Sequence, residues 1–236
     1  MSDREAWDPK AEEWADRIGD DGDDNRRYQS DPVLWRLAGD VRGLRVLDHG
    51  CGSGYLTLKL AARGAKAIGI DVSPRMIEVA KRRAAAKGVR LDLRVDTSAA
   101  LATIPAASID LVVSNYVLMD GEDLDGCVRS LSRVLVAGGR AVLIFSHPCF
   151  EPGLPGDYFD ERTYDEEWGP FKTKFVVHHR PLSRYVSAFL SAGFGIEALE
   201  EPVVPRPCPP ALDPARFARM RARPWSIAFA LRKGVP

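Results

Sequence analysis

The sequence predicts an α/β protein with a doubly wound, largely parallel sheet of seven strands, in which the last strand is antiparallel. Short apolar strand patterns alternate with helical patterns up to Leu199. The first strand pattern runs directly into a glycine-rich turn and then a helix. The final strand pattern, Trp225 to Leu231, is not preceded by a helix long enough for a parallel crossover.

The length of 236 residues suits a single domain with one elaboration. We divide it into an N-terminal cap, a cofactor-binding core, a lid insertion after the fifth strand, and the C-terminal part of the core. These parts are residues 1–40, 41–148, 149–180 and 181–236 of the single domain 1–236.

Composition and charge exclude several classes of protein. Lys+Arg and Asp+Glu both number 33, so the balanced charge argues against a nucleic-acid or anionic-membrane partner. No apolar run approaches membrane-spanning length, and no secretory signal is visible at the N-terminus. The 4 cysteines are scattered without a C-x-x-C pair, which is typical of reduced thiols in a cytoplasmic protein. We expect a monomer or homodimer.

The first strand and turn occupy residues 44–54, in which Asp48 is followed by Gly50, Gly52 and Gly54. Ligands bind α/β sheets at the carboxyl ends of the strands, and glycines allow close approach to the main chain. The following residues, 55–63, have apolar positions at helical spacing, and Gly64 suits the helix end.

The second strand pattern, residues 67–70, ends at Asp71. A carboxylate at this position can accept hydrogen bonds from both ribose hydroxyls, so Asp71 indicates an adenosine ligand without choosing which one. Ser73-Pro74 then begins a helix that ends at Gly88.

Three further strand ends carry polar residues. The alternating residues 89–95 precede Asp96-Thr97, and the strand 109–114 precedes Asn115-Tyr116. We expect a short helix over 98–104, a helix over 124–134, and a fifth strand over 141–145 that leads to His147.

Both flanking regions are rich in aromatic residues. The N-terminal cap contains spaced tryptophans and Tyr28, which we favour for a polar contact with cofactor or substrate. The segment after His147 mixes aromatics with acids and is too long for a plain connection, so we interpret it as a substrate lid.

Five motifs in order resemble the class I S-adenosylmethionine-dependent methyltransferases of small-molecule type. They are Asp48 with the three glycines, residues 68–71, residues 94–97, residues 109–115, and residues 136–139. The resemblance implies a Rossmann-like seven-stranded sheet and the cofactor S-adenosyl-L-methionine. In this family Asp96 would accept the adenine amino hydrogens. The implied cofactor-binding residues are Tyr28, Asp48, Gly50, Cys51, Gly52, Asp71, Val72, Met76, Asp96, Thr97, Asn115 and Tyr116.

On the acceptor side, His147 is the candidate catalytic base, because histidine takes up a proton near neutral pH. It could equally be structural. Tyr158, Tyr164 and Trp168 are the candidate substrate-binding residues. No cluster of residues has metal-binding spacing.

The sequence therefore predicts methyl transfer to a small organic metabolite, with the methylated atom (O, N or C) open. One alternative is a cofactor-binding protein with a regulatory or non-methylating role, such as a cyclase. A nicotinamide oxidoreductase is disfavoured by Tyr55, which stands where the dinucleotide fingerprint needs Gly or Ala, and by Asp96-Thr97.

Overall fold

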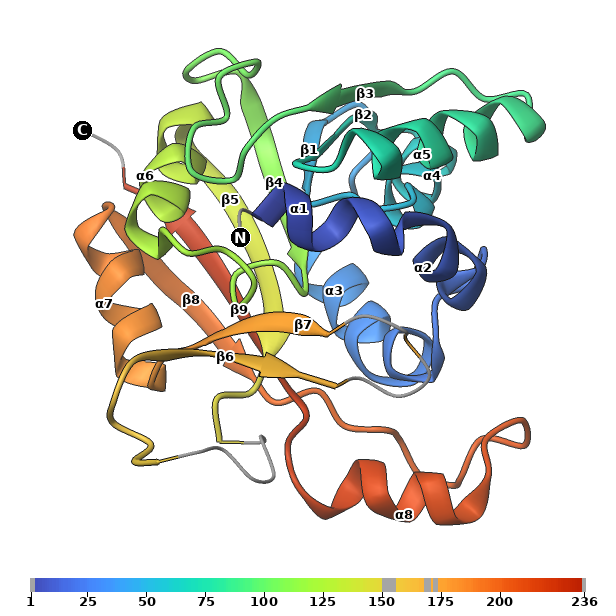
Figure 1. Ribbon diagram of the computed structural model, residues 1–236. Coiled ribbons are helices and arrows are strands. Elements are labelled where there is room, and N and C mark those ends of the chain that lie inside the picture. The colour runs from blue at the N-terminus through green and yellow to red at the C-terminus, as the bar shows by residue number, and fades with distance from the viewer. Residues whose placement is uncertain (1–2, 150–155, 168–170, 172–173, 235–236) are drawn as a thin grey trace.

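A computed structural model of the chain describes residues 3–149, 156–167, 171 and 174–234 (Figure 1). Its central sheet has seven strands in the order β3-β2-β1-β4-β5-β9-β8. Strands β1 to β5 are parallel, whereas β9 is antiparallel to both β5 and β8. The predicted seven-stranded sheet with an antiparallel last strand is confirmed.

The elements follow one another in the predicted order, except that turns instead of a helix connect β3 to β4. The central strands are β1 Arg45–His49, β2 Lys66–Asp71, β3 Asp92–Val95, β4 Ile109–Asn115, β5 Leu135–Ser146, β8 Phe194–Glu200 and β9 Ser226–Lys233. The α-helices are α1 Asp3–Trp7, α2 Ala11–Ile18, α3 Asp31–Ala38, α4 Tyr55–Ala62, α5 Pro74–Ala86, α6 Leu124–Val134, α7 Leu182–Ser191 and α8 Pro214–Ala222. A 3₁₀ turn, Asp8–Lys10, precedes α2, and a π-helical turn, Arg26–Ser30, precedes α3.

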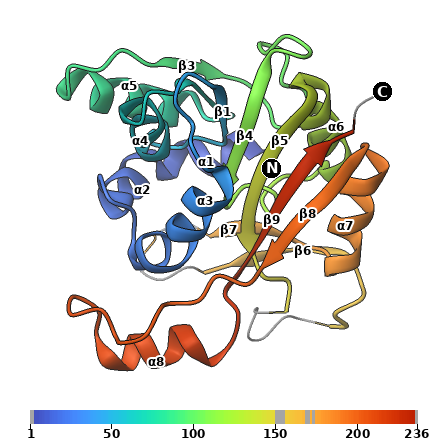
Figure 2. The same ribbon diagram turned by 180° about the vertical axis from the view of Figure 1, so that it is seen from behind.

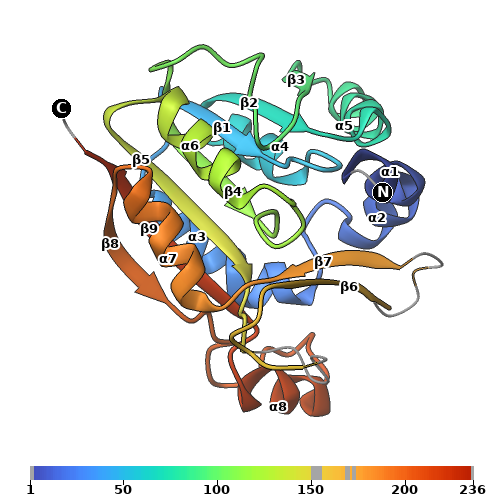
Figure 3. The same ribbon diagram turned by 60° about the vertical axis from the view of Figure 1, so that its left-hand side comes forward.

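Helices cover both faces of the sheet, as a doubly wound fold requires. Figure 3 shows α6 and α7 in front of the sheet and α3 behind it. On the first face, α6 and α7 bury residues such as Leu131 and Phe189 against alternate strand side chains such as Val112 and Phe229. On the other face, α3 and α4 bury their apolar residues against the intervening strand positions.

The register brings the carboxyl ends of three strands together. His49, the last residue of β1, pairs with Ile70 of β2 and with Ser114 of β4. The glycine turn after β1, Asp71 at the end of β2, and Asn115 at the end of β4 therefore lie at one edge of the sheet.

A two-stranded antiparallel sheet stands outside the central one, after β5. It pairs β6, Arg162–Glu166, with β7, Phe175–His179. Phe175 packs against Trp7 and Trp14 of the N-terminal helices, with ring centroids 5.5 and 6.4 Å away. The hairpin thus contacts the N-terminal cap (Figure 1). Its role as a lid stays a prediction.

The helix expected over 98–104 was wrong. The segment instead forms turns around the Asp96 carboxylate, which accepts backbone hydrogen bonds from Thr97, Ala102 and Thr103. Those amide hydrogens are thereby diverted from a helical ladder.

The C-terminal helix α8 lies at the lower edge of the molecule in Figure 2 and leads into β9, whose first residue, Ser226, pairs with Ser146 at the carboxyl end of β5. Its Met220 forms a small apolar cluster with Val204 and Leu212. Among the helices that the structure describes, none is long and apolar enough to cross a membrane.

Candidate functional site

A cavity opens at the sheet edge where the strand ends meet, with about 730 Å³ of free space when the solvent at its open mouth is included. Its walls come mainly from the N-terminal helices, the turn after β1, the end of β2 and the segment after β4, with further residues from the start of α5 and the turn after β3. The lining residues include Asp3, Trp7, Trp14, Arg26, Gly50, Cys51, Gly52, Ser53, Tyr55, Asp71, Val72, Met76, Ser98, Asn115, Tyr116, Val117 and Asp120.

The glycine turn is folded by backbone contacts. The Cys51 N–H donates to the Ile70 carbonyl oxygen at 2.8 Å, which fastens the turn to β2. Gly50 has φ +68°, and a Cβ there would lie 2.3 Å from the Val117 side chain. Only glycine fits this combination of left-handed backbone and close approach.

Asp71 is buried and aims its carboxylate at the same turn. One oxygen accepts the Gly52 N–H and the other accepts the Ser73 N–H, each at 2.9 Å. Each oxygen keeps a further lone pair for a ligand hydroxyl. Burial raises the pKa of Asp71 to about 6, although these backbone hydrogen bonds oppose the shift. The ionised form of Asp71 is therefore costly in free energy until a further hydrogen-bond donor reaches it.

Asp48 lies beneath the turn rather than on the cavity wall. It is 2% exposed and accepts a hydrogen bond from the Thr57 hydroxyl of α4. Burial raises the pKa of Asp48 to about 7, and the Asp71 charge adds to the effect. Its visible contact ties the turn to α4.

Asn115 and Tyr116 form the cavity wall at the end of β4. The Tyr55 hydroxyl donates to Asp31 at 2.9 Å and receives the Asn115 Nδ2–H at 3.0 Å. Tyr116 has a positive φ of 63°. This strained conformation is of the kind that concentrates at functional sites.

Arg26 is a cavity residue that the sequence analysis missed. Its guanidinium is 3% exposed, lies 5.0 and 4.9 Å from the ring centroids of Trp14 and Tyr116, and pairs with Asp23 at 3.0 Å. Tyr28, two residues later, lies outside this wall and packs against the apolar cluster of Val204, Leu212 and Met220. The segment's π-helical turn decides which side chain faces inward, and no periodic pattern signals that turn.

Asp96 and Thr97 stand next to the cavity rather than on its wall, where their neighbour Ser98 is found. The Asp96 carboxylate accepts four hydrogen bonds, from the Thr97, Ala102 and Thr103 amides and from the Thr103 hydroxyl. These bonds fill its usual acceptor sites. A contact with an adenine amino group stays a prediction and would require one of them to open.

His147 lies just beyond β5, and both of its ring nitrogens have a partner. Nδ1 accepts the Cys149 N–H at 3.1 Å, and Nε2 lies 3.2 Å from Glu201 Oε1. Because Nδ1 accepts, the proton is on Nε2 and points to Glu201. Burial lowers the pKa of His147, opposed by Glu201. The arrangement favours a neutral imidazole without an available lone pair.

The candidate substrate residues occupy different positions. The Tyr158 hydroxyl accepts the Leu182 N–H at 2.9 Å, at the start of α7. Tyr164 lies on β6, opposite Val177 of β7. Trp168 lies outside the described residues. Neither Tyr158 nor Tyr164 lines the cavity described above, and contact of the three residues with a substrate stays a prediction. In the part of the chain that the structure describes, no three His, Cys, Asp or Glu side chains are grouped to hold a metal ion.

This fold and strand-end cavity define an α/β protein that binds a nucleoside-containing cofactor at its glycine turn. The chain belongs to the methyltransferase domain family, whose profile matches residues 40–177, more than half of its length. Class I members use S-adenosyl-L-methionine, and that is the cofactor of this chain.

Individual relatives agree with this family. The chain resembles the ubiquinone biosynthesis O-methyltransferase of Methylocella silvestris, with 42% identity over 99 residues, which are 42% of this chain and 38% of that protein. The match thus spans well under half of the relative's length. A structure of an S-adenosylmethionine-dependent methyltransferase from Mesorhizobium loti superposes with a TM-score of 0.74 and 28% identity, covering 91% of this chain and 100% of that one. The cyclase SpnF shares the fold, with a TM-score of 0.62 and 20% identity over 88% of this chain and 82% of its own.

The residues fit the cofactor. A buried carboxylate with free acceptor capacity stands at the end of β2, facing a turn without side-chain bulk. The Asn115 Oδ1 atom, buried on the same cavity wall, has no hydrogen-bond partner in the described part of the chain. Ribose hydroxyls would satisfy the Asp71 carboxylate, and a donor from either reactant would satisfy the Asn115 oxygen.

Proposed function

We propose that the chain transfers a methyl group from S-adenosyl-L-methionine to a small organic metabolite. Bound at this site, the cofactor supplies a methyl group already activated by a positively charged sulfur. The chain's own residues then have to hold the reactants in line and exclude water.

The proposal assigns these tasks to the two walls of the cavity. Asp71 would hold the ribose, and the turn at Gly50–Gly52 would receive the rest of the cofactor at close range. Trp7, Trp14 and Tyr116 would provide an apolar cover that keeps water from the reacting atoms. We propose further that the acceptor is a metabolite rather than a nucleic acid, and that the chain acts in the cytoplasm as a monomer or homodimer.

The observation that carries the proposal is the composition of the cavity. It joins the cofactor residues to acidic and aromatic side chains, Asp3, Asp120, Trp7 and Trp14, that an adenosine pocket alone does not require. A site lined by both groups of residues suits a transferase.

The experiment has two stages. Calorimetry should first show binding of S-adenosylhomocysteine, the demethylated product, and weaker or absent binding of NAD. The protein is then incubated with methyl-labelled S-adenosylmethionine and a metabolite extract, and labelled products are identified by mass spectrometry. A labelled small molecule, absent with the Asp71→Ala variant, supports the proposal.

A second candidate is a cofactor-binding protein that catalyses another reaction. The fold that the chain shares with the cyclase SpnF supports this alternative, because one fold can host different reactions. Tight binding of S-adenosylhomocysteine together with no labelled product from any extract would favour this alternative.

A further inference from the structure

Two carboxyl groups reach the cavity from outside the cofactor motifs. Asp3 comes from α1, and Asp120 follows β4. In the part of the chain that the structure describes, burial and the charges of neighbouring groups act on the Asp120 carboxyl, and no hydrogen bond contributes. Burial, and then the nearby Asp3 charge, raises the pKa of Asp120 well above its ordinary value, while Arg26 and Lys10 oppose the shift. The carboxyl is thus placed where a positive ligand would stabilise it.

The cations near this carboxyl are engaged elsewhere. Arg26 pairs with Asp23 and lies between two aromatic rings. Lys10 is 3% exposed, donates to the Ala6 carbonyl oxygen, and lies 4.9 Å from the Phe175 ring centroid. Neither forms an ion pair with Asp120, although both lower its pKa from a distance.

A second acceptor on the cavity wall is fixed by a relay of side chains. The Asp31 carboxylate pairs with Lys59 at 3.4 Å and accepts the Tyr55 hydroxyl, so the Tyr55 oxygen must itself accept from Asn115 Nδ2. This chain of hydrogen bonds, from Asn115 to Tyr55 to Asp31, fixes the orientation of the Asn115 amide. Its Oδ1, an acceptor on a side chain 9% exposed, is left without a donor.

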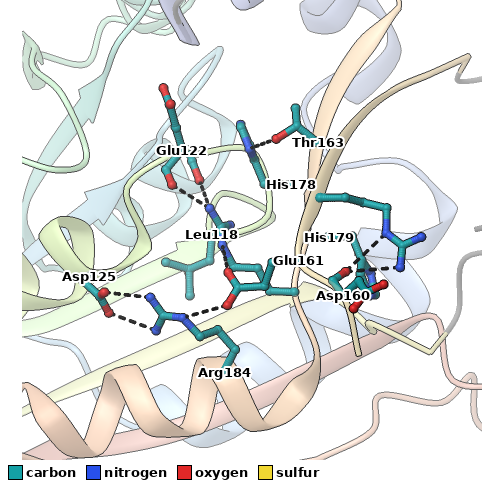
Figure 4. Close-up of polar contacts among 12 residues, drawn as sticks. Leu118, Glu122, Asp125, Asp160, Glu161, Thr163, His178, His179 and Arg184 are labelled. Atoms are coloured by element: carbon teal, nitrogen blue, oxygen red, sulfur yellow. Dashed lines mark hydrogen bonds and ion pairs between the residues drawn. The ribbon is translucent and has the colours of Figure 1, made fainter. Parts of the chain in front are cut away.

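The loop that carries Asp120 is held in place rather than loosely attached. Arg180 donates to the carbonyl oxygens of Leu118, Gly121 and Glu122. Figure 4 shows Leu118 and Glu122 of this loop near His178 of β7. The His178 N–H of β7 donates to the Met119 carbonyl oxygen at 3.0 Å. The hairpin therefore fixes the backbone on both sides of Asp120.

We infer that the methyl acceptor is an organic amine, bound as its ammonium ion between the Asp120 carboxylate and Asn115 Oδ1, with Trp7 and Trp14 against its apolar part. This inference rests on the proposed function and gives it a substrate class. Two hydrogen-bond acceptors flanked by aromatic rings match a group that is positive and rich in hydrogen-bond donors.

The Asp120 carboxylate also accepts the proton that the ammonium ion must lose before methyl transfer. The ammonium gives one proton to Asp120, which leaves a neutral amine with a free lone pair. That lone pair forms the new N–C bond to the methyl carbon as the C–S bond breaks and its electron pair stays on sulfur. The product is a methylammonium ion, and Asp120 releases its proton to water when the product leaves.

The test compares amines with alcohols of the same shape: benzylamine, 2-phenylethylamine and tryptamine against benzyl alcohol, 2-phenylethanol and tryptophol. Binding is measured by calorimetry on protein saturated with S-adenosylhomocysteine. At least one amine should bind about tenfold or more tightly than its alcohol, as expected for a hydrogen-bonded charge. Asp120→Asn should reduce that preference to about threefold or less, with Asp3→Asn as a second, milder variant.

Glu78→Gln is the matched control, because Glu78 is an exposed acid on α5 away from the cavity. It should keep the full preference. A panel in which no amine binds more tightly than its alcohol overturns the inference, as does an Asp120→Asn protein that keeps the preference. Equal loss of S-adenosylhomocysteine affinity in Asp120→Asn would assign the carboxyl to the cofactor's own amino group and also overturn it. Failure of the parent to bind S-adenosylhomocysteine would instead refute the proposed function.

Discussion

The two walls of the cavity are held by different kinds of contact. On the cofactor wall, backbone amides of the glycine turn bond to β2, through Cys51 to Ile70 and through Gly52 to Asp71. The acceptor wall is formed by the N-terminal helices and the segment after β4. It is held by side chains from distant parts of the chain, such as Arg180, which donates to the loop after β4, and Phe175, which packs against Trp7. The first wall depends on local sequence, whereas the second depends on contacts between distant parts of the chain.

The comparison predicts that the cofactor wall tolerates side-chain bulk least of all. In Gly50→Ala, the new Cβ would lie 2.3 Å from Val117 at a φ of +68°. Left-handed strain and overpacking together should lower the free energy of unfolding by about 2–5 kcal/mol. Chemical denaturation measures this change.

Gly88→Ala separates the two contributions. Gly88 has φ +67° but nothing within 4 Å of its Cβ position, so that variant should lose only about 1–2 kcal/mol. Equal losses in both variants would mean that the close approach to Val117 is unimportant.

The second prediction concerns Asp71, whose carboxylate accepts a hydrogen bond from the glycine turn and is proposed to hold the ribose. Asp71→Asn keeps the shape but replaces one acceptor oxygen by a donor, which opposes either the Gly52 or the Ser73 N–H. Affinity for S-adenosylhomocysteine should fall roughly ten- to a hundredfold, equivalent to about 1.5–3 kcal/mol. Calorimetry with Glu78→Gln as control measures it, and unchanged affinity in a folded variant would remove Asp71 from the ribose.

The sequence predicted the cofactor wall because its signals are local. Three glycines after a short strand, and an acid at the end of the next strand, define their geometry within a few residues. The sheet order with its antiparallel last strand followed from the alternation of elements. Even here, turns around Asp96 replaced the helix expected over 98–104, because a side-chain acceptor competed with helical hydrogen bonding.

The acceptor wall could not be predicted in the same way. Arg26 lines the cavity while Tyr28 does not, because a π-helical turn sets their directions. Asp120 became noticeable only when Arg180, 60 positions further along, was seen to hold its loop. The one available signal was an acid just after the apolar residues 117–119.

The third prediction tests whether the burial of Asp48 destabilises the protein when no cofactor is bound. The pKa of Asp48 is raised to about 7, so the folded chain binds this proton more tightly than the unfolded chain does. The contribution of Asp48 to the free energy of unfolding is therefore lost as pH rises from about 4 to about 7. Asp48→Asn should gain stability relative to the parent over that range, by more than about 1 kcal/mol at pH 7.5. Denaturation of both proteins at pH 5 and pH 7.5 measures the difference, and a constant difference would contradict it.

The smallest effect is expected at His147, on the acceptor side of the molecule. Its Nδ1 accepts the Cys149 N–H and its Nε2–H faces Glu201, so proton uptake would require the first contact to break. A general base would lose about 10²–10⁴-fold in kcat on removal. We expect His147→Ala to keep its methyl-transfer rate within about threefold, because the ring holds the chain after β5 and is not among the residues that line the cavity. Loss of these hydrogen bonds should instead lower the free energy of unfolding by about 1 kcal/mol. Glu201→Gln, which keeps an acceptor for Nε2–H, should show a smaller loss. A hundredfold fall in kcat with unchanged stability would return His147 to the mechanism and would show that the imidazole turns toward the cavity during turnover.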